Sequence, residues 1–296
     1  MFFYPDPMLA PLDNEVIFKI AFTDMDVFTC FVRDIVGINV QVNKIETEKR
    51  FFPKVGNIDF AYDIFAESTD HRIVIEIQKV EYDYHFDRFL HYHNMAIAEL
   101  QRSAREYKID VEVYTIVVLT SPYNGLDKRG RAIKNEVLIS GADTRDLKDK
   151  IVPIYGHQLI FLNPHHKTKQ TPQNYRDWLY LFYESTENRE NYKVNLANKG
   201  IQKAVKLISI DNLSPEKNRE IKETEGKRVV LSILQKEINQ KDAWLKEAID
   251  KRKEAEQDKA NFQSNMIKKL HEKRNSMEDI VEITGVSLED IRKILE

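Results

Sequence analysis

Asp63, Glu76 and Gln78 have the side chains and the spacing to do chemistry, because they fall in two neighbouring segments typical of β-strands, residues 57–66 and 72–79. Side chains alternate between the two faces of a strand, so Glu76 and Gln78 share a face. The second segment is otherwise largely β-branched and apolar, where a buried carboxylate is costly unless function retains it. A short turn predicts a hairpin that brings Asp63 close to Glu76. Two converging carboxylates would give oxygen ligands to a hard divalent cation.

The elements expected around this pair are typical of an α/β fold. Asp13 is expected to cap a first helix, and a second helix from Asp24 to Val36 is expected to end at Gly37. Apolar patterns predict, in order, a strand at 40–50, a helix at 84–107, a strand buried on both faces at 111–120, and strands at 136–140 and 151–162. This order favours helices packed on a sheet over a doubly wound sheet, with the core closing near residue 165.

The composition changes after the core, and the rest of the chain is predicted to be helical. Ser276 and Ser287 each precede a carboxylate by three residues, which is the pattern of a capping box at a helix start, and Gly285 lies between them. The sequence therefore predicts four parts: an α/β core at 1–165, a helical subdomain packed on it at 166–213, a charged helical arm at 214–275, and a short helix–turn–helix hairpin at 276–296.

Sparse apolar residues recur along the arm at helical spacing, for example Val230, Leu234 and Ile238. They predict one packed stripe, and a homo-oligomer formed through the arm is one way to cover it. The terminal hairpin is short and acidic, so it favours a stabilising cap or a protein contact over a DNA-reading element.

The composition bounds the partners of the chain. Its 296 residues carry a formal net charge of −3, so DNA binding must rest on a local basic patch. The single cysteine excludes a disulfide framework. No apolar run approaches membrane-spanning length and the N-terminus lacks the basic start of a signal peptide, so we expect a cytoplasmic protein with no membrane partner.

The eight histidines do not indicate a zinc centre. His91 and His93 are two residues apart on a predicted helix and point in different directions. His165 and His166 fall in a basic loop with two lysines, a composition that would equally suit contact with phosphate.

The candidate residues also resemble a known nuclease signature. The positions that carry the resemblance are, in chain order, an opening at 13–19, Asp63, Glu76, Gln78, Arg88, Tyr92 and an ending at 281–291. Glutamine at position 78 stands where the common PD-(D/E)XK pattern has lysine. Arg88 and Tyr92 are four residues apart and so share one face of a helix. Together these positions make the chain similar to the Rpn-type recombination-promoting nuclease and putative transposase family.

The resemblance implies a restriction-endonuclease-like core, in which helices flank a central mixed sheet, followed by a C-terminal all-helical extension. It also implies a Mg²⁺-dependent DNA endonuclease that hydrolyses phosphodiester bonds in DNA recombination or transposition, with Mn²⁺ able to substitute. Asp63 and Glu76 would hold the metal, and the backbone carbonyl of Ile77 would be a third oxygen ligand.

Three side chains would complete this site. Gln78 would orient the attacking water but, unlike lysine, would add no positive charge. Arg88 would supply that charge by gripping a phosphate oxygen, and Tyr92 would donate a hydrogen bond to phosphate or to a ligand carboxylate.

Three neighbouring residues are weaker candidates. Asp59 shares a strand face with Asp63, either as a second acidic group or as a surface residue. Glu15 on the first helix would approach the metal from another side. Lys79 alternates to the face opposite Gln78, so we do not assign it the role of the missing lysine.

Two other interpretations stay open. Asp63 and Glu76 would also fit as structural carboxylates paired with a cation such as Arg88. Glutamine at position 78 would also fit a nuclease fold that has lost catalysis and serves as a DNA-binding or oligomeric assembly module.

Overall fold

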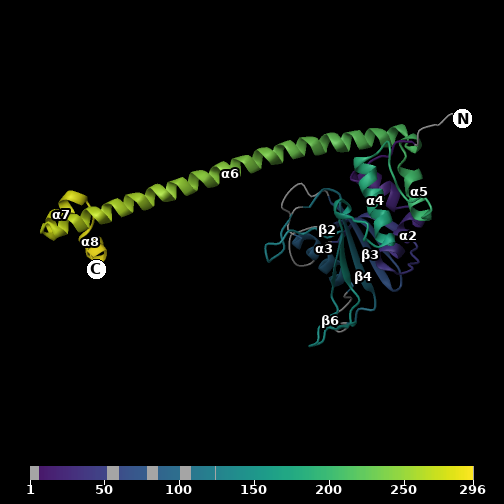
Figure 1. Cartoon of the computed structure of the whole chain (residues 1–296), viewed down its shortest axis with the longest axis horizontal. Coiled ribbons are helices and arrows are strands. Elements are labelled where there is room, and N and C mark those ends of the chain that lie inside the picture. The colour runs from purple at the N-terminus through teal and green to yellow at the C-terminus, as the bar shows by residue number, and fades with distance from the viewer. Residues whose placement is uncertain (1–6, 52–59, 79–85, 101–107, 124, 296) are drawn as a thin grey trace. The chain divides into compact units, whose positions relative to one another are not determined.

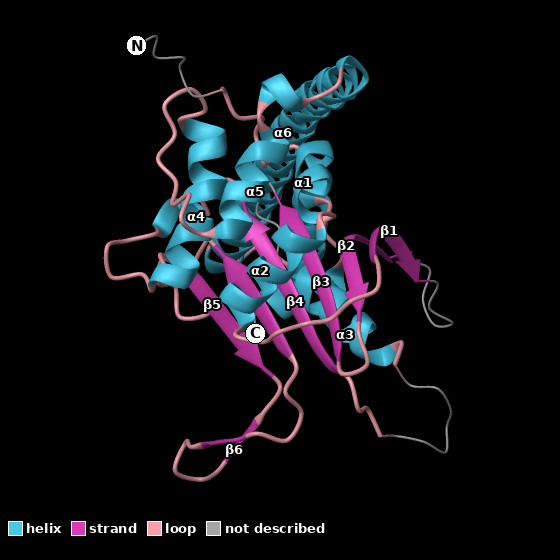
Figure 2. Ribbon diagram, turned by 90° about the vertical axis from the view of Figure 1, so that its right-hand side faces the viewer, coloured by secondary structure: helices cyan, strands magenta, loops and turns pink. Residues whose placement is uncertain are grey.

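A mixed six-stranded β-sheet with helices on both faces forms the core of the protein. The computed structural model describes residues 7–51, 60–78, 86–100, 108–123 and 125–295. The strand order is β1-β2-β3-β4-β8-β5, and Figure 2 shows how the helices cover the sheet. The predicted fold class, an α/β core with a mixed sheet and a helical C-terminal extension, is confirmed.

The centre of the sheet is parallel and its two sides are antiparallel. The strands are β1 (Ile45–Phe51), β2 (Phe60–Glu67), β3 (His71–Gln78), β4 (Glu112–Leu119), β5 (Val137–Gly141), β6 (Thr144–Arg145), β7 (Ile151–Val152) and β8 (Gln158–Leu162). β3, β4 and β8 run parallel. β1, β2 and β3 form an antiparallel meander, which includes the predicted hairpin, and β5 is antiparallel to β8.

The strand predicted at 151–162 is wrong as a single element. β7 pairs with β6 in a separate two-stranded hairpin, and only β8 joins the main sheet. Between them, Oδ1 of Asp143 accepts hydrogen bonds from three consecutive backbone N–H groups, those of Ile154, Tyr155 and Gly156. Gly156 also has a positive φ of 73°. A turn held in this way interrupts a strand however apolar its flanks are.

Four helices cover one face of the sheet and enclose the largest hydrophobic core. They are α1 (Glu15–Phe22), α2 (Met25–Val36), α4 (Gln173–Glu187) and α5 (Lys199–Ile208). Aromatic rings bring the first pair to the second, with the centroids of Phe31 and Trp178 5.0 Å apart and those of Phe22 and Phe182 5.6 Å apart. The two helices that precede the sheet in the chain therefore share a single core with the two that follow it.

The capping residues predicted for α1 and α2 can be compared with those in the structure. As predicted, Asp24 caps α2 and Gly37 ends it with a φ of 84°. The predicted cap of α1 is wrong by one residue, because Oδ1 of Asn14, and not Asp13, accepts the N–H groups of Val16 and Ile17. Asp and Asn are about equally good N-caps, so the backbone at the helix start decides between neighbours.

A single described helix, α3 (Asp87–Ala98), covers the opposite face. Phe89 and Ala96 of α3 are buried there, next to Val117 and Val113 of β4 respectively. β4 is consequently buried on both faces, as predicted. Of the helix predicted at 84–107, the first two residues and the last seven lie outside the described residues.

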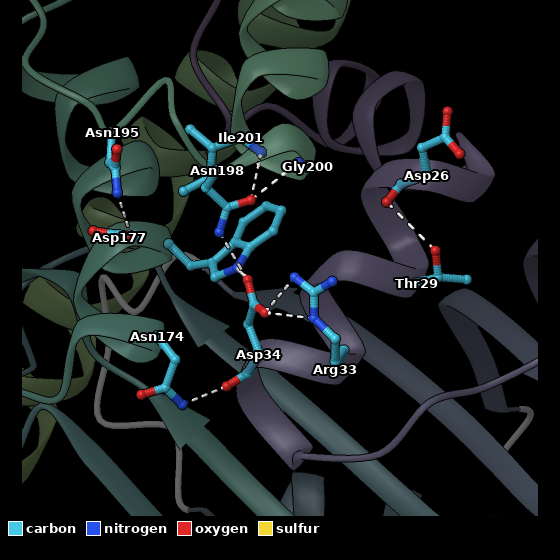
Figure 3. A network of polar contacts seen from close by, with 11 residues as sticks. Asp26, Thr29, Arg33, Asp34, Asn174, Asp177, Asn195, Asn198, Gly200 and Ile201 are labelled. Atoms are coloured by element: carbon cyan, nitrogen blue, oxygen red, sulfur yellow. Dashed lines mark hydrogen bonds and ion pairs between the residues drawn. The ribbon is translucent and has the colours of Figure 1, made fainter.

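Asp34 near the end of α2 ties this helix to α4 and α5 (Figure 3). Its Oδ2 accepts hydrogen bonds from Nε1 of Trp178 at 2.9 Å and from Nδ2 of Asn198 at 2.8 Å. Its backbone carbonyl accepts a third bond from Nδ2 of Asn174. Arg33 pairs with the other carboxylate oxygen but is half exposed. One carboxylate thus satisfies polar groups of two helices at the edge of the core.

The chain divides after Glu225 into a second compact unit, Gly226–Glu296. Helix α6 (Pro215–Glu272) is followed by α7 (Met277–Thr284) and α8 (Leu288–Leu295), which are labelled in Figure 1. Ile267, Ile280 and Ile291, one from each helix, are fully buried together. Ser276 and Asp279 form the predicted capping box of α7. None of the helices in the described part of the chain combines the length and apolar character needed to span a membrane.

We expect Asp34→Ala to lower the free energy of unfolding by about 2–3 kcal/mol, because it leaves the N–H donors of the buried Trp178 and the partly buried Asn198 unsatisfied. Urea unfolding followed by circular dichroism measures this loss. Arg33→Ala is the matched control, since its exposed ion pair to Asp34 contributes about 1 kcal/mol or less. Equal losses in the two variants would contradict the role of Asp34 as the link between helices.

Candidate active site

Strands β2 and β3 separate at the point where Asp63 and Glu76 face each other. The last backbone pairs between these strands include Ile64 with Ile75. Beyond that pair, the N–H of Asp63 donates to Oε1 of Glu76 at 3.1 Å, and the N–H of Ile77 donates to Oδ2 of Asp63 at 2.9 Å. Each carboxylate therefore accepts a hydrogen bond from a backbone N–H of the opposite strand, in place of a backbone carbonyl of its own strand. The two acids converge as predicted.

Both carboxylic acids are held in a poorly solvated position. Glu76 is 4% exposed, and its burial, followed by repulsion from Asp63, raises its pKa well above 4.5. Burial likewise raises the pKa of Asp63 from 3.8 to about 6, against the lowering effect of its hydrogen bond from Ile77. Without a compensating cation, Asp63 therefore releases its proton only near pH 6, and ionisation of Glu76 beside it is opposed still more strongly.

The donor set at this position fits a magnesium-like ion. A strand residue that donates its N–H to one neighbour also turns its carbonyl to that neighbour, so the carbonyl of Ile77 faces the β2 side with Asp63. Two carboxylates and a carbonyl are hard oxygen ligands. No group of three or more His, Cys, Asp or Glu suited to a metal occurs among the described residues. Such a site leaves coordination positions for water and substrate, which is the usual arrangement for Mg²⁺.

Helix α3 brings the second half of the predicted site to the same place. Nη1 of Arg88 donates to Oε1 of Gln78 at 3.2 Å, and Nη2 donates to the hydroxyl of Tyr92 at 2.9 Å. The Arg88 guanidinium also lies 5.1 Å from the centroid of the Tyr92 ring. In the described part of the chain, Arg88 forms no ion pair with Asp63 or Glu76. Its charge acts on both carboxyl groups over a longer distance and lowers their pKa values.

Lys19 and Glu48 also lie beside the site, and sequence reasoning missed them. Nζ of Lys19 pairs with Glu15 one helical turn earlier and with Glu48 at 2.7 Å. Glu48 falls between Thr47, which pairs with Ile64, and Lys49, which pairs with Tyr62, and its φ of 51° is rare for a residue with a side chain. Glu15 is close enough for its charge to raise the pKa values of Asp63 and Glu76. Only the i, i+4 spacing of Glu15 and Lys19 was visible in the sequence.

The other sequence candidates fall elsewhere. Asp59 and Lys79 lie outside the described residues. His91 is exposed, whereas His93 is buried with Nδ1 2.9 Å from the hydroxyl of Thr115. Burial lowers the pKa of His93 to about 4. The two histidines of α3 therefore point to different environments, as their spacing predicted.

Comparison with known proteins identifies one family. A family model described as "PD-(D/E)XK nuclease family transposase" matches residues 15–231. The match contains every candidate residue described above and extends from α1 into α6. No curated protein and no solved structure matches the chain.

The buried acids predict a pH-dependent stability. Asp63 keeps its proton up to about pH 6 in the folded state and releases it near pH 3.8 when unfolded, so metal-free stability should fall between about pH 4 and 6 and stay low above. Asp63→Asn keeps the acceptor for Ile77 and removes the charge. We expect this variant to match the wild type at pH 4 and to exceed it at pH 8 by on the order of 2 kcal/mol.

Urea midpoints in the presence of EDTA at pH 4, 6 and 8 measure this difference. Asp70→Asn, in the exposed turn of the same hairpin, serves as the control and should follow the wild-type profile. A profile of Asp63→Asn that runs parallel to that of the wild type at all three pH values would contradict the burial argument.

Proposed function

The chain belongs to the PD-(D/E)XK nuclease family of transposases, and from this premise we propose that it is a metal-dependent DNA endonuclease that hydrolyses phosphodiester bonds in DNA recombination or transposition. The observation that carries the proposal is the separation of β2 from β3, where Asp63 and Glu76 are bonded to backbone instead of to a cation. A stable structural site would have paired these charges within the protein.

We assign the metal to Asp63, Glu76 and the backbone carbonyl of Ile77. The ion is Mg²⁺, for which Mn²⁺ can substitute, because all three ligands are hard oxygens. When bound, the ion would activate water and neutralise charge that develops on the scissile phosphate. Raised pKa values at both acids indicate that they need a cation to be ionised together near neutral pH.

Gln78 and Arg88 together would replace the lysine of the common pattern, with Gln78 positioning the water and Arg88 supplying the positive charge. The side-chain amide of Gln78 would position the attacking water, but it carries no charge. Arg88 donates to Oε1 of this amide, so the cation lies next to the residue that lacks one. Tyr92 accepts a hydrogen bond from the same guanidinium and holds it in place, and its hydroxyl proton would be donated to phosphate or to a ligand carboxylate. Arg88 is exposed and so accessible to a phosphate oxygen.

We expect purified protein to nick supercoiled plasmid DNA with Mg²⁺ and to lose at least about 100-fold in rate in Asp63→Ala and Glu76→Ala, because each removes a metal ligand. Arg88→Ala and Gln78→Ala should lower the rate by about 10–100-fold, since each removes one charge or hydrogen bond at the phosphate or the water. Gel assays give the rates, and calorimetric titration with Mn²⁺ gives metal affinity.

The controls separate metal binding from chemistry. Asp70→Ala, an exposed carboxylate in the β2–β3 turn, should keep full activity. Gln78→Ala should bind Mn²⁺ as the wild type does, whereas Glu76→Ala should not. Undiminished cutting by both ligand variants would overturn the site, and metal binding without any cutting would favour a module that has lost catalysis.

A second function, self-assembly, is favoured by the surface of α6. Leu234, Ile238, Leu245 and Ile249 have 46–54% of their side chains exposed along this helix. Residues 234, 238 and 245 are four and seven residues apart, which fits the heptad of a coiled coil with Lys241 at the seam position between them. In a coiled coil, two identical helices cover one another's stripe. We propose a second copy of the chain as the partner, because the same stripe on both helices is self-complementary.

Leu234→Lys/Ile238→Lys should convert such an oligomer to a monomer, because two charges cannot be buried in the seam. Size-exclusion chromatography with light scattering measures the mass. Ala243→Lys adds charge on the opposite side of the same helix and should leave the mass unchanged. A monomeric wild type would contradict self-assembly without bearing on the nuclease site.

A further inference from the structure

A loop that joins β4 to β5 and a segment that joins β8 to α4 both begin at the end of the sheet on which Gln78 lies. β3, β4 and β8 are parallel, so their carboxyl ends share this edge. β5 runs the other way, and its first residue, Val137, pairs with Leu162 at the end of β8. The segment 121–136 therefore spans from the end of β4 to the start of β5 at this end of the sheet, and 163–172 leaves from the end of β8 beside it.

The first of these loops is basic and exposed. Residues 121–136 contain four Lys or Arg and two Asp or Glu. The Asp127 carboxylate is bonded within the loop itself. It accepts hydrogen bonds from the backbone N–H groups of Arg129 and Arg131 and forms an ion pair with the Arg131 side chain. The resulting turn presents Lys128 and Arg129 at its exposed tip, and Lys134 is exposed on the return.

This loop is fixed beside the helix that carries Arg88. Tyr123 is buried with its ring centroid 4.8 Å from that of Phe86, which directly precedes α3. Ile133 on the return packs against the same cluster, which includes Phe89. Arg88 lies in the chain between these two phenylalanines, so the loop is anchored next to the helical turn that carries Arg88.

The second segment is basic without any acidic residue of its own. Residues 163–172 contain two Lys and two His and no Asp or Glu, in a chain with 48 acidic residues. Lys167 lies 3.3 Å from the ring centroid of Tyr183 and 4.9 Å from that of Tyr180 on α4. Lys169 is exposed two residues further on. This side of the edge thus combines ammonium groups with aromatic rings.

Hydrogen bonds join both segments to the backbone of Gln78. The N–H of Thr120 donates to the carbonyl of Gln78 at 2.9 Å. Nε2 of His165 is 3.0 Å from the carbonyl of Thr120, and Nε2 of His166 is 3.2 Å from that of Tyr123. The basic loops are therefore attached to the strand end that carries the candidate catalytic amide.

We propose that Lys128, Arg129, Lys134 and Lys169, here called the basic edge, bind the phosphate backbone of DNA on both sides of the scissile bond. The proposal rests on the proposed nuclease function and names the surface through which its substrate is held. A protein of net charge −3 gains no general attraction to DNA, so a local surface has to supply it. Exposed lysine and arginine contact phosphates independently of base sequence.

The test is the salt dependence of DNA affinity, measured by fluorescence anisotropy with a labelled random-sequence duplex in EDTA, where no metal-dependent cutting interferes. Lys128→Ala/Arg129→Ala removes two phosphate contacts and should reduce the slope of log affinity against log salt by about 1.8. That change corresponds to about 60-fold weaker binding at about 0.1 M salt if the two contacts contribute nothing at 1 M. Lys134→Ala/Lys169→Ala, one residue from each loop, should behave alike.

Lys246→Ala/Lys253→Ala on α6 is the matched control, because it removes the same charge from exposed helix positions. Its affinity should stay within about twofold of the wild type. Wild-type slopes in the loop variants, an equal loss in the control, or a wild type that does not bind DNA would each overturn the basic edge. Glu76→Ala should bind DNA as the wild type does, so a loss of cutting without a loss of DNA affinity leaves the basic edge in place. If the wild type cuts DNA and the loop variants bind DNA with wild-type affinity, the basic edge is overturned while the nuclease function stands.

Discussion

The burial of two facing carboxylic acids at the separation of β2 from β3 is the constraint around which the rest of the site is arranged. Neither acid can ionise easily there, and each uses an oxygen to satisfy a backbone N–H that has lost its strand partner. Surrounding charges act on the pair from three sides, with Glu15 opposing ionisation and Lys19 and Arg88 favouring it at Asp63. A divalent cation would resolve the conflict, because it favours the charged form of both acids together.

The fold keeps these groups in place from elements far apart in sequence. The Asp34 carboxylate joins α2 to α4 and α5, and their shared core supports the face of the sheet beneath α1. On the other face α3 packs on β4 through Phe89 and so fixes the helical turn that carries Arg88. Because both faces are packed, the strand end at Gln78 cannot shift without disturbing a core.

Sequence patterns predicted the features that local chemistry determines. The cap at Asp24, the glycine end of α2 and the hairpin that brings Asp63 to Glu76 follow from residue type and spacing. Two other features depend on the path of the backbone: Asn14, and not Asp13, caps α1, and a turn separates β7 from β8. Residue types alone do not determine that path. The bond from Arg88 to Gln78 and the unusual φ of Glu48 arise from tertiary contacts, so no spacing in the sequence indicates them.

A DNA nuclease has to collect acids for its metal and bases for its substrate within a short distance, and opposite charges placed together would neutralise one another. Here the two are separated by burial. The acids are enclosed between β2 and β3, where raised pKa values limit their charge in the metal-free protein. The cations lie on exposed loops after β4 and β8, where water favours the charged form and phosphate can reach it. Arg88 donates a hydrogen bond to Gln78, so the uncharged amide that replaces the usual lysine has a cation as its direct neighbour.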